Sequence, residues 1–301
     1  MAAAPISLHA SGRARRRLVV NRLAELGAVA AALLAVCFLG VLVGSVLARA
    51  FHALTLHLFT KGPAVFGQTG GGIAPAFVGT LILLAIAIAI AVPIGVLLAI
   101  YVSEFASTRV ARQLKLWLDV LNGFPSIVIG IFVFEFMVAA KVPILGLGHH
   151  QSAWAGGIAL SIIMVPLVSR TTMEVLALVP NELREASYAL GVSKWRTVLS
   201  VVLPSALGGI VTGTTLAVAR AAGETAPLLF TCSIFGQIVT TNPNISMASV
   251  PVIIFEYSES PDRNLNAQAW AAAFVLIAFV LVTSLTARVM LERSRRKLGR
   301  V

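Results

Sequence analysis

Long, mostly apolar stretches recur along this chain, and each has enough residues to cross a lipid bilayer as a helix. The first, 27–48, contains no charged side chain, and further runs cover about 73–101, 116–140, 153–175, 204–227 and 267–290. A transmembrane helix needs about 20 residues. A backbone in lipid has no water to bond, so it must satisfy its polar groups internally, as a helix does. The sequence therefore predicts an all-α, polytopic membrane protein with six transmembrane helices.

The composition agrees with a membrane location. Of the 301 residues, 58% are hydrophobic and only 12% are charged, whereas a soluble domain carries about 25% charged residues. The formal net charge of +11 raises the alternative of nucleic-acid binding. The distribution of the cations argues against it, because they gather at both ends of the chain and in alternating loops.

Lysine and arginine are abundant in every second predicted loop and scarce in the others. The segments 1–26, 102–115, 170–200 and 288–301 hold 18 of them, and the three remaining loops hold 4. Loops on the cytoplasmic side carry the excess of cations in membrane proteins. We therefore expect a multi-pass protein of the plasma (inner) membrane, in contact with membrane lipid, with both termini cytoplasmic and no nucleic acid among its partners.

This topology divides the chain into three parts. Residues 1–26 form a basic cytoplasmic N-terminal segment, which is expected to be disordered or to lie on the membrane surface, and 291–301 form a basic cytoplasmic tail. Residues 27–290 form the six-helix transmembrane domain. Within this domain, 103–115 is expected to be a polar loop and 231–266 a long loop with apolar patches, such as Val250–Phe255.

The longest polar interruption between two apolar runs is Asn181–Pro204, whose pattern predicts a helix, a turn and a second helix. Pro180 suits the first helical position, where a missing N–H costs nothing. Gly191 is placed to end the first helix by adopting a positive φ, and Ser193 to cap the second. The first helix carries an apolar stripe at helical spacing, and four charged residues are expected to hold the hairpin in water: Arg184, Glu185, Lys194 and Arg196. The stripe consists of Leu183, Ala186 or Ser187, and Leu190.

The hairpin contains a pattern of the form E-A-A, three residues, G, nine residues, I-x-L-P, which is matched by Glu185, Ala186, Ser187, Gly191, Val201, Leu203 and Pro204. This pattern resembles the cytoplasmic coupling loop of ABC importer permeases. Ser187 replaces the second alanine and Val201 the isoleucine. The resemblance implies that 181–204 docks on an ATPase subunit. The alternative is an ordinary surface hairpin with a glycine turn.

Three further stretches narrow the resemblance: Pro93–Tyr101 followed by Ser103–Ala106, Asn122–Gly130 with Phe132, and Arg220–Pro227. They resemble the PstA-type phosphate permeases. The resemblance implies the permease fold of a type I ABC importer that carries inorganic phosphate. It also implies three partners, namely a PstC-type permease, a PstB-type ATPase dimer and a PstS-type external phosphate-binding protein.

Arg220 and Glu224 are the candidate contacts for the transported anion. They are four residues apart, so they are expected to share a helix face. A charge in a spanning helix is costly and usually faces the bundle interior or a wet pathway. The planar fork of arginine suits an oxyanion, and a carboxylate can accept the proton that phosphate keeps near neutral pH. The alternative is that the two residues only neutralise each other.

Other charged residues in the spans leave their roles open. Asp119 and Glu135 either line a pathway or pair with a partner permease, and Arg170 is expected to be a cation that snorkels from the end of its span.

The chain shows no sign of its own catalytic chemistry. It lacks the phosphate-binding motif G-x4-G-K-[ST], a catalytic triad, paired carboxylates and metal-ligand spacing. We therefore expect no enzyme activity, no metal and no cofactor on this chain, with ATP used by a partner subunit. Two alternatives remain open: a permease for sulfate, molybdate or an organic solute, and a self-sufficient secondary transporter or channel.

Overall fold

The computed structural model describes residues 12–64, 67, 70–139, 150–232, 236 and 238–298. The first residues of the basic N-terminal segment, the loop that carries Lys141 and the last residues of the tail lie outside this part. The chain divides into two compact units, Met1–Ala48 and Arg49–Val301, which are described separately below. The described elements are helices and the turns that join them, which agrees with the predicted fold class.

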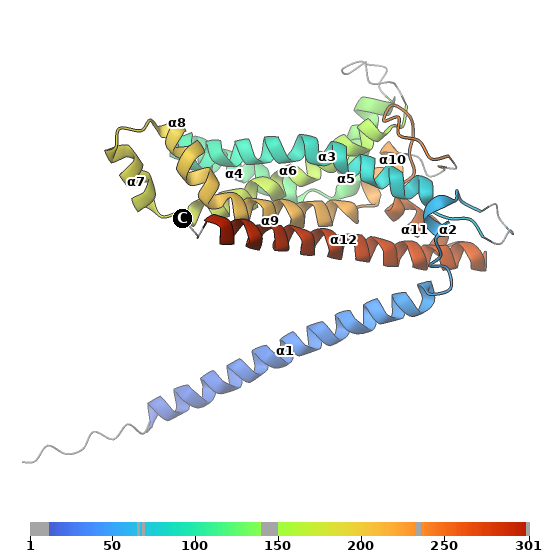
Figure 1. The fold of residues 1–301 in the computed structure, drawn as a ribbon, viewed down its shortest axis with the longest axis horizontal. Coiled ribbons are helices and arrows are strands. Elements are labelled where there is room, and N and C mark those ends of the chain that lie inside the picture. The colour runs from blue at the N-terminus through green and yellow to red at the C-terminus, as the bar shows by residue number, and fades with distance from the viewer. Residues whose placement is uncertain are drawn as a thin grey trace, which may run out of the picture. The chain divides into compact units, whose positions relative to one another are not determined.

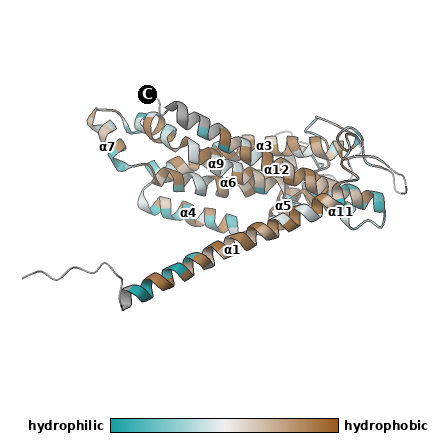
Figure 2. Cartoon of the chain, turned by 60° about the horizontal axis from the view of Figure 1, so that its bottom comes forward, coloured by the Kyte–Doolittle hydropathy of each residue, from teal (hydrophilic) through white to brown (hydrophobic). Residues whose placement is uncertain are grey.

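The described part of the first unit belongs to one long helix, α1 (Arg13–Ala50), whose last two residues are part of the second unit. We expected the span to begin at Gly27, after a disordered or surface-bound segment, but the helix already begins at Arg13. Residues 13–26 contain neither proline nor glycine and are rich in arginine, leucine and alanine, which favour a helix. Figure 2 shows the hydrophilic start of α1 passing directly into its apolar part.

Four long helices form the body of the second unit and run side by side in Figure 1. They are α3 (Ala74–Ile100), α6 (Ala153–Ala177), α9 (Leu203–Ala222) and α12 (Arg263–Leu298). α3 packs on α6, α6 on α9, and α9 on α12. Their buried core combines large side chains such as Leu160 and Met164 with alanines such as Ala91 and Ala217.

Small residues allow α3, α6 and α9 to approach one another closely. A Cβ added to Gly157 of α6 would lie 2.4 Å from Cγ2 of Ile86 on α3, and one added to Gly213 of α9 would lie 2.4 Å from Oγ1 of Thr171 on α6. Glycine at such positions lets membrane helices gain van der Waals contact along their backbones. Neither position has space for a larger residue without movement of its neighbour.

The third predicted span, 116–140, is broken rather than continuous. α4 (Thr108–Gly123) is followed by α5 (Ser126–Phe134) and a π-helical turn, η2 (Glu135–Ala139), and the two parts are bent by 94°. Pro125 has no N–H to donate and disfavours a helical Phe124, whose backbone is extended at φ −66° and ψ 135°. The preceding segment is also helical from Thr108, so most of 103–115 is not the loop that we expected.

Five described helices are long and apolar enough to cross a membrane, and the bent α4–α5 pair brings the number to six if it counts as one span. The two helices of the pair differ in character in Figure 2, since hydrophilic residues alternate with apolar ones along α4, whereas α5 is apolar. This agrees with the predicted set of six.

Short helices cover one end of the bundle. They are α2 (His57–Thr60), α10 (Ala226–Thr231) and α11 (Val250–Ser258). The apolar patch that we placed in a loop forms most of α11, whose Val250 and Ile253 are buried. The hydroxyl of Thr80 on α3 accepts a hydrogen bond of 2.8 Å from the backbone N–H of Val250. This helix is therefore anchored to α3.

The loop before α12 is tied down at the same end. The Asp262 carboxylate accepts backbone hydrogen bonds from Gly67 and Asn264, each at 2.8 Å. These hydrogen bonds hold the pKa of Asp262 below its usual range, and the bond from Gly67 has the largest effect. The carboxylate therefore stays ionised at neutral pH and keeps the loop that contains Gly67 attached to the start of α12.

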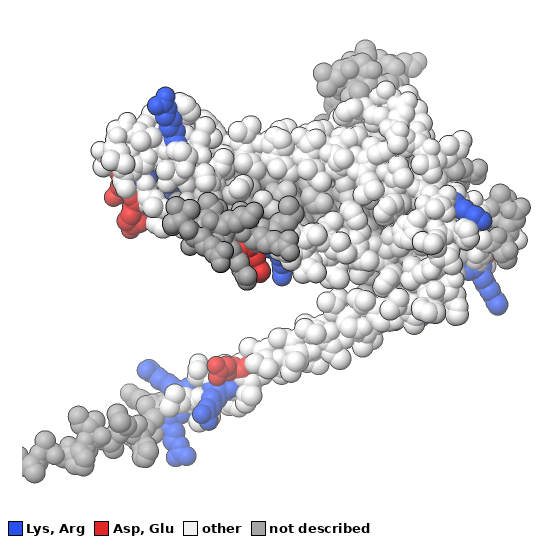
Figure 3. Space-filling model, viewed as in Figure 1, with Lys and Arg blue, Asp and Glu red and all other residues white. Residues whose placement is uncertain are grey.

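On the face of the second unit seen in Figure 3, charged side chains lie at both ends of the bundle, and one acidic and one basic side chain lie between the ends beside the grey atoms. The C-terminal end of α12 lies at the same end as the hairpin 181–204, opposite α2 and α11 (Figure 1). Most of the surface between the two ends carries no charge in Figure 3, which suits a bundle in lipid with two wet ends.

Candidate coupling and transport site

Arg220 lies in the last turn of α9, and its guanidinium approaches the carboxylate of Glu224. The distance from Nε to Oε1 is 3.9 Å, which is an ion pair but too long for a hydrogen bond. The Arg220 side chain is 52% exposed, whereas the Glu224 side chain is only 17% exposed. The donors of Arg220 are therefore available to another acceptor.

The two residues do not share a helix, which corrects our expectation. α9 ends at Ala222, Gly223 is its C-cap, and Glu224 lies in the turn before α10. Pro227 explains this ending, because a proline cannot donate the hydrogen bond to Gly223 that a continuing helix would need. The fifth predicted span thus stops short of 227, but the turn still brings the carboxylate near the guanidinium.

The Asn122–Gly130 stretch packs against the segment that carries Glu224. α5 lies on α10, and a Cβ on Gly130 would come within 2.5 Å of Cα of Pro227. Glycine at position 130 therefore allows the backbone of α5 to touch α10. Two of the stretches that resemble the PstA-type permeases, far apart in sequence, are adjacent in the structure.

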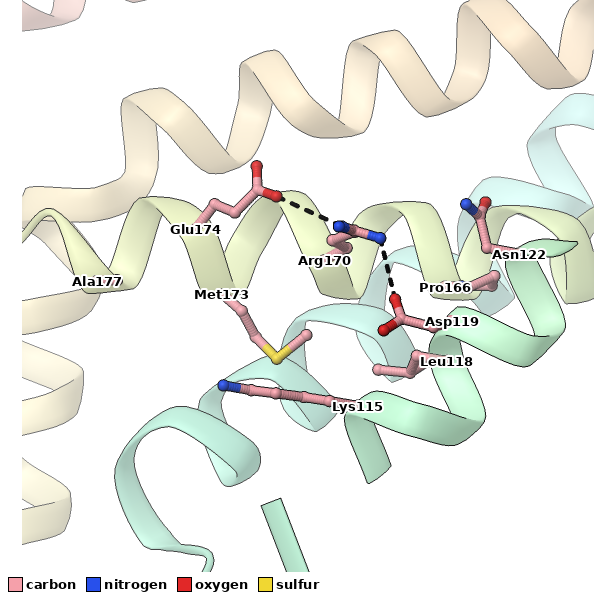
Figure 4. Close-up of a pocket in the computed structure, with 9 residues that line it drawn as sticks. All are labelled: Lys115, Leu118, Asp119, Asn122, Pro166, Arg170, Met173, Glu174 and Ala177. Carbon is pink, nitrogen blue, oxygen red and sulfur yellow. Dashed lines mark hydrogen bonds and ion pairs between the residues drawn. The ribbon is translucent and has the colours of Figure 1, made fainter. Parts of the chain in front are cut away.

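A pocket of about 280 Å³ lies between α4 and α6 and contains an acidic and basic cluster. Arg170 donates to Asp119 at 2.9 Å and lies 3.5 Å from Glu174, as Figure 4 shows. Asp119 thus has an ion-pair partner within this chain, and Arg170 is more than a snorkelling cation. Glu135 is exposed and makes no ion pair with the residues that the structure describes.

The hairpin 181–204, which we call the coupling hairpin, has the predicted order of helix, turn and helix. α7 (Asn181–Ala189) is followed by α8 (Lys194–Thr197), and a π-helical turn, η3 (Val198–Val202), joins α8 to α9. Gly191 has a φ of 78°, which confirms its predicted conformation. Pro180 and Ser193 are the N-cap residues, one position before the first helical residue in each case, and the Ser193 hydroxyl makes no capping bond.

Ser187 holds the two arms of the coupling hairpin together. Its buried hydroxyl lies 2.9 Å from the hydroxyl of Thr197 on α8. A second alanine at this position, as in the family pattern, would leave Thr197 without that partner. The rest of the expected apolar stripe is exposed, because Leu183, Ala186 and Leu190 all lie at the surface.

The other residues of the coupling pattern divide between surface and interior. Glu185 and Pro204 are exposed, whereas Leu203 is partly buried at the start of α9. Exposed Leu183, Leu190 and Trp195 give the hairpin an apolar surface beside its charges. A surface of this kind is suited to contact with another protein.

Arg184 is where the structure departs furthest from our expectation for the coupling hairpin. We expected it to keep the hairpin in water, but its side chain is only 15% exposed and pairs at 2.8 Å with Glu104. Glu104 lies in η1 (Tyr101–Phe105), the π-helical turn that continues α3. The sequence gives a signal only for the other contacts of Arg184, which follows the end of α6 closely enough for its guanidinium to reach the carbonyl groups of Leu176 and Val179.

The family to which the chain belongs follows from comparison with known proteins. Residues 91–297 match the model of the family described as "Binding-protein-dependent transport system inner membrane component". This match covers more than half of the chain and includes the coupling hairpin. The chain therefore belongs to this family of inner-membrane permease components.

Curated relatives define its place within that class. The phosphate transport system permease protein PstA of Yersinia pestis is 37% identical over 276 residues, which are 91% of either chain. The phosphate transport system permease protein PstA 1 of Mycobacterium tuberculosis is 40% identical over 232 residues, covering 76% of this chain and 73% of that protein. Within its class the chain is a member of the PstA family, which confirms the resemblance found in its motifs.

Solved structures agree on the fold. The methionine ABC transporter MetNI, in an inward-facing conformation, superposes with a TM-score of 0.56 at 18% identity, covering 73% of this chain and 94% of that chain. A bacterial ABC transporter that imports the acidic polysaccharide alginate gives a TM-score of 0.53 at 16% identity, covering 73% and 78%. These likenesses concern the fold alone, and they confirm an ABC importer permease fold.

The chain is accordingly a multi-pass inner-membrane permease and not an ATPase. ATP hydrolysis belongs to a partner subunit, in agreement with the missing nucleotide-binding motif. Transporters of this class also depend on a binding protein.

Proposed function

We propose that this chain is the permease subunit through which an ATP-driven importer carries inorganic phosphate across the inner membrane. The observation that carries the proposal is the half-exposed Arg220 guanidinium, with the mostly buried Glu224 carboxylate 3.9 Å away. The PstA relatives support it, since they are phosphate transport permeases by name.

The pair provides one donor and one acceptor for a protonated oxyanion. Arg220 can offer two parallel N–H groups to two phosphate oxygens. Glu224 can accept the hydrogen bond of a P–OH group, which phosphate retains near neutral pH and sulfate does not. The same carboxylate would repel a fully ionised sulfate, so the pair selects for phosphate over sulfate.

The coupling hairpin makes the contact with the ATPase in this proposal. Glu185, Ala186, Ser187, Gly191, Leu203 and Pro204 form its framework. Its exposed Leu190 and Trp195 offer apolar surface to a cleft on the ATPase. The complete importer contains a PstC-type permease, a PstB-type ATPase dimer and a PstS-type external phosphate-binding protein. The binding protein delivers phosphate, and the closing ATPase dimer moves the hairpins and changes the side to which the pathway opens.

The proposal includes an orientation for the chain. Both termini and the coupling hairpin face the cytoplasm, supported by the 18-to-4 division of cations. The basic segments 1–26 and 291–301 flank the permease domain 27–290 on that side. The end of the bundle that carries α2 and α11 then faces the binding protein.

The roles of Arg220 and Glu224 are tested by neutralising both residues together. If they form only a structural ion pair, the double variant Arg220→Gln with Glu224→Gln removes both charges and restores assembly and uptake. As a phosphate site, the double variant assembles with its partners but imports no radiolabelled phosphate. Arg220→Lys transports poorly as well, because an ammonium group keeps the charge but lacks the bidentate fork.

A control variant shows whether the loss of a positive charge anywhere on the chain is enough to impair transport. Arg109 is an exposed arginine on α4 that forms no ion pair within the described residues. Arg109→Gln should assemble and import phosphate at the normal rate.

Near-normal phosphate uptake by the double variant, at normal complex yield, would contradict the phosphate role. Uptake of sulfate, molybdate or an organic solute by the wild-type complex instead of phosphate would favour the alternative substrate.

A further inference from the structure

One guanidinium group joins three segments of the chain where the coupling hairpin meets the membrane helices. Arg184 on α7 donates from Nη1 to the carbonyl of Val179 at 2.7 Å and from Nη2 to the carbonyl of Leu176 at 3.1 Å. It also donates from Nη2 and Nε to one carboxylate oxygen of Glu104, at 2.8 and 3.3 Å. The side chain thus contacts the end of α6, the π-turn η1 and its own helix.

Arg184 adds donors at the C-terminal end of α6. The Leu176 carbonyl also accepts a hydrogen bond of 3.3 Å from the backbone N–H of Val179, and a cation near a helix C-terminus interacts favourably with its dipole. Glu104 is only 7% exposed, so its carboxylate depends on Arg184 for a charged partner. A mostly buried pair of this kind is much more sensitive to loss of one member than a surface pair.

A second cationic contact reaches the same π-turn. The ammonium group of Lys194 on α8 lies 5.3 Å from the ring centroid of Phe105, the residue after Glu104. Both arms of the coupling hairpin therefore hold η1, one through a carboxylate and one through an aromatic ring. The π-turn, closed by the bond from Ala106 N–H to the Tyr101 carbonyl at 2.8 Å, continues directly from α3. Short π-helical segments of this kind often occur at functional sites.

We propose that Arg184 is a positioning residue that transmits movement of the coupling hairpin to α3 through Glu104. The inference rests on the proposed docking of that hairpin on an ATPase. Covalent connections join the hairpin only to α6 and α9, so α3 receives the movement through non-covalent contacts. Arg184 supplies the hydrogen-bonded part of this contact and Lys194 the cation–π part. When the hairpin moves, the guanidinium of Arg184 carries the Glu104 carboxylate with it, and η1 and the attached end of α3 follow.

The test uses the assembled importer in proteoliposomes, with ATP hydrolysis and phosphate uptake measured on the same preparation. Arg184→Lys keeps the charge for Glu104 but replaces the three guanidinium nitrogens, which between them reach several acceptors, by a single nitrogen. Glu104→Gln keeps the shape but removes the charge. Both variants should hydrolyse ATP at the basal rate. The phosphate imported per ATP hydrolysed should fall by about tenfold, within the range typical of coupling between distant sites. Arg109→Gln serves as the control and should keep the wild-type ratio.

The outcomes separate this inference from the proposed function. If the wild-type importer takes up no phosphate, the proposed function fails. The positioning role of Arg184 is then tested by comparing, between the wild type and the two variants, how strongly the binding protein stimulates ATP hydrolysis. If the wild type transports and both variants keep its ratio of uptake to hydrolysis, the positioning role is wrong. A lower yield of complex with an unchanged ratio per assembled complex would identify a purely structural contact and would also overturn the inference. Failure of both variants to assemble would have the same meaning.

Discussion

The guanidinium of Arg170 on α6 donates a hydrogen bond of 2.9 Å to the carboxylate of Asp119 on α4, although the two residues belong to different predicted spans. Glu174, one turn further along α6, adds a second carboxylate at 3.5 Å (Figure 4). The Arg170 and Asp119 side chains are 55% and 62% exposed. Arg170 therefore separates two carboxylates on the wall of the pocket between these helices.

This arrangement predicts unequal effects for substitutions within the cluster. Asp119→Asn leaves Arg170 neutralised by Glu174, so it should lower the free energy of unfolding by less than about 1 kcal/mol, as for an exposed ion pair. Arg170→Gln leaves two carboxylates without their shared cation and should be more destabilising. Thermal unfolding of the detergent-solubilised complex checks the order. Equal losses for both variants would show that the cluster does not act as a unit.

The topology can be checked by labelling single cysteines. In a background without Cys37 and Cys232, cysteines at Ser107 and Ser193 should resist an impermeant thiol reagent applied to intact cells, because the cation distribution places them in the cytoplasm. A cysteine at Ser258 should react. All three positions are exposed, so burial does not confuse the comparison. Labelling of Ser193→Cys from outside would refute both the topology and the coupling role of its hairpin.

Gly191 tests whether the coupling hairpin requires its turn geometry. No atom lies within 4 Å of a Cβ at this position. The substitution Gly191→Val should therefore destabilise the turn through the backbone φ of 78° and not through a clash. The left-handed conformation costs about 1–2 kcal/mol for a residue with a Cβ. The variant should reach the membrane but stimulate the ATPase weakly. Gly27→Val is a matched control, since Gly27 also faces open space but has no positive φ. Full stimulation with Gly191→Val would show that the turn tolerates other residues.

Gly130 tests the contact between α5 and the segment that carries Glu224. Gly130→Ala places a methyl group within 2.5 Å of Cα of Pro227, so α10 must shift and Glu224 with it. We expect phosphate uptake to fall severalfold while the complex still assembles, because a small displacement of a binding group can lower transport strongly. Gly44→Ala, at a position with open space, should have no effect. Normal uptake with Gly130→Ala would mean that the position of Glu224 does not depend on α5.

The apolar runs of the sequence predict the helices of the fold well, because length and hydrophobicity are sufficient to identify a membrane span. They do not reveal the bend at Pro125, since α4 and α5 form one run when hydropathy is averaged over both. They also hide the end of α9 before Pro227, because alanine and proline continue the apolar pattern past the last helical turn. Helix α11 is missed for the opposite reason, since nine residues are too few for a span.

The site is predictable to the extent that it depends on local sequence. The positive φ of Gly191 follows from its place between two helical patterns, and the approach of Arg220 to Glu224 follows from their spacing. The contact between Arg184 and Glu104 joins positions 80 residues apart, and no local pattern encodes such a distance. The hydrogen bond between Ser187 and Thr197 also escapes a local pattern, because the two residues lie on different arms of the hairpin and meet only when the turn has folded.

The close packing at Gly157 and Gly213 has a consequence for any measurement of movement in this protein. α3 and α6 meet at Gly157, and α6 and α9 meet at Gly213, so close approach of each helix pair is fixed at one position within the bundle. Distances between labels that flank these two contacts should therefore change less during the transport cycle than distances that involve the coupling hairpin or η1. The two glycine contacts thus provide a local reference against which displacements at the hairpin end of the bundle can be measured.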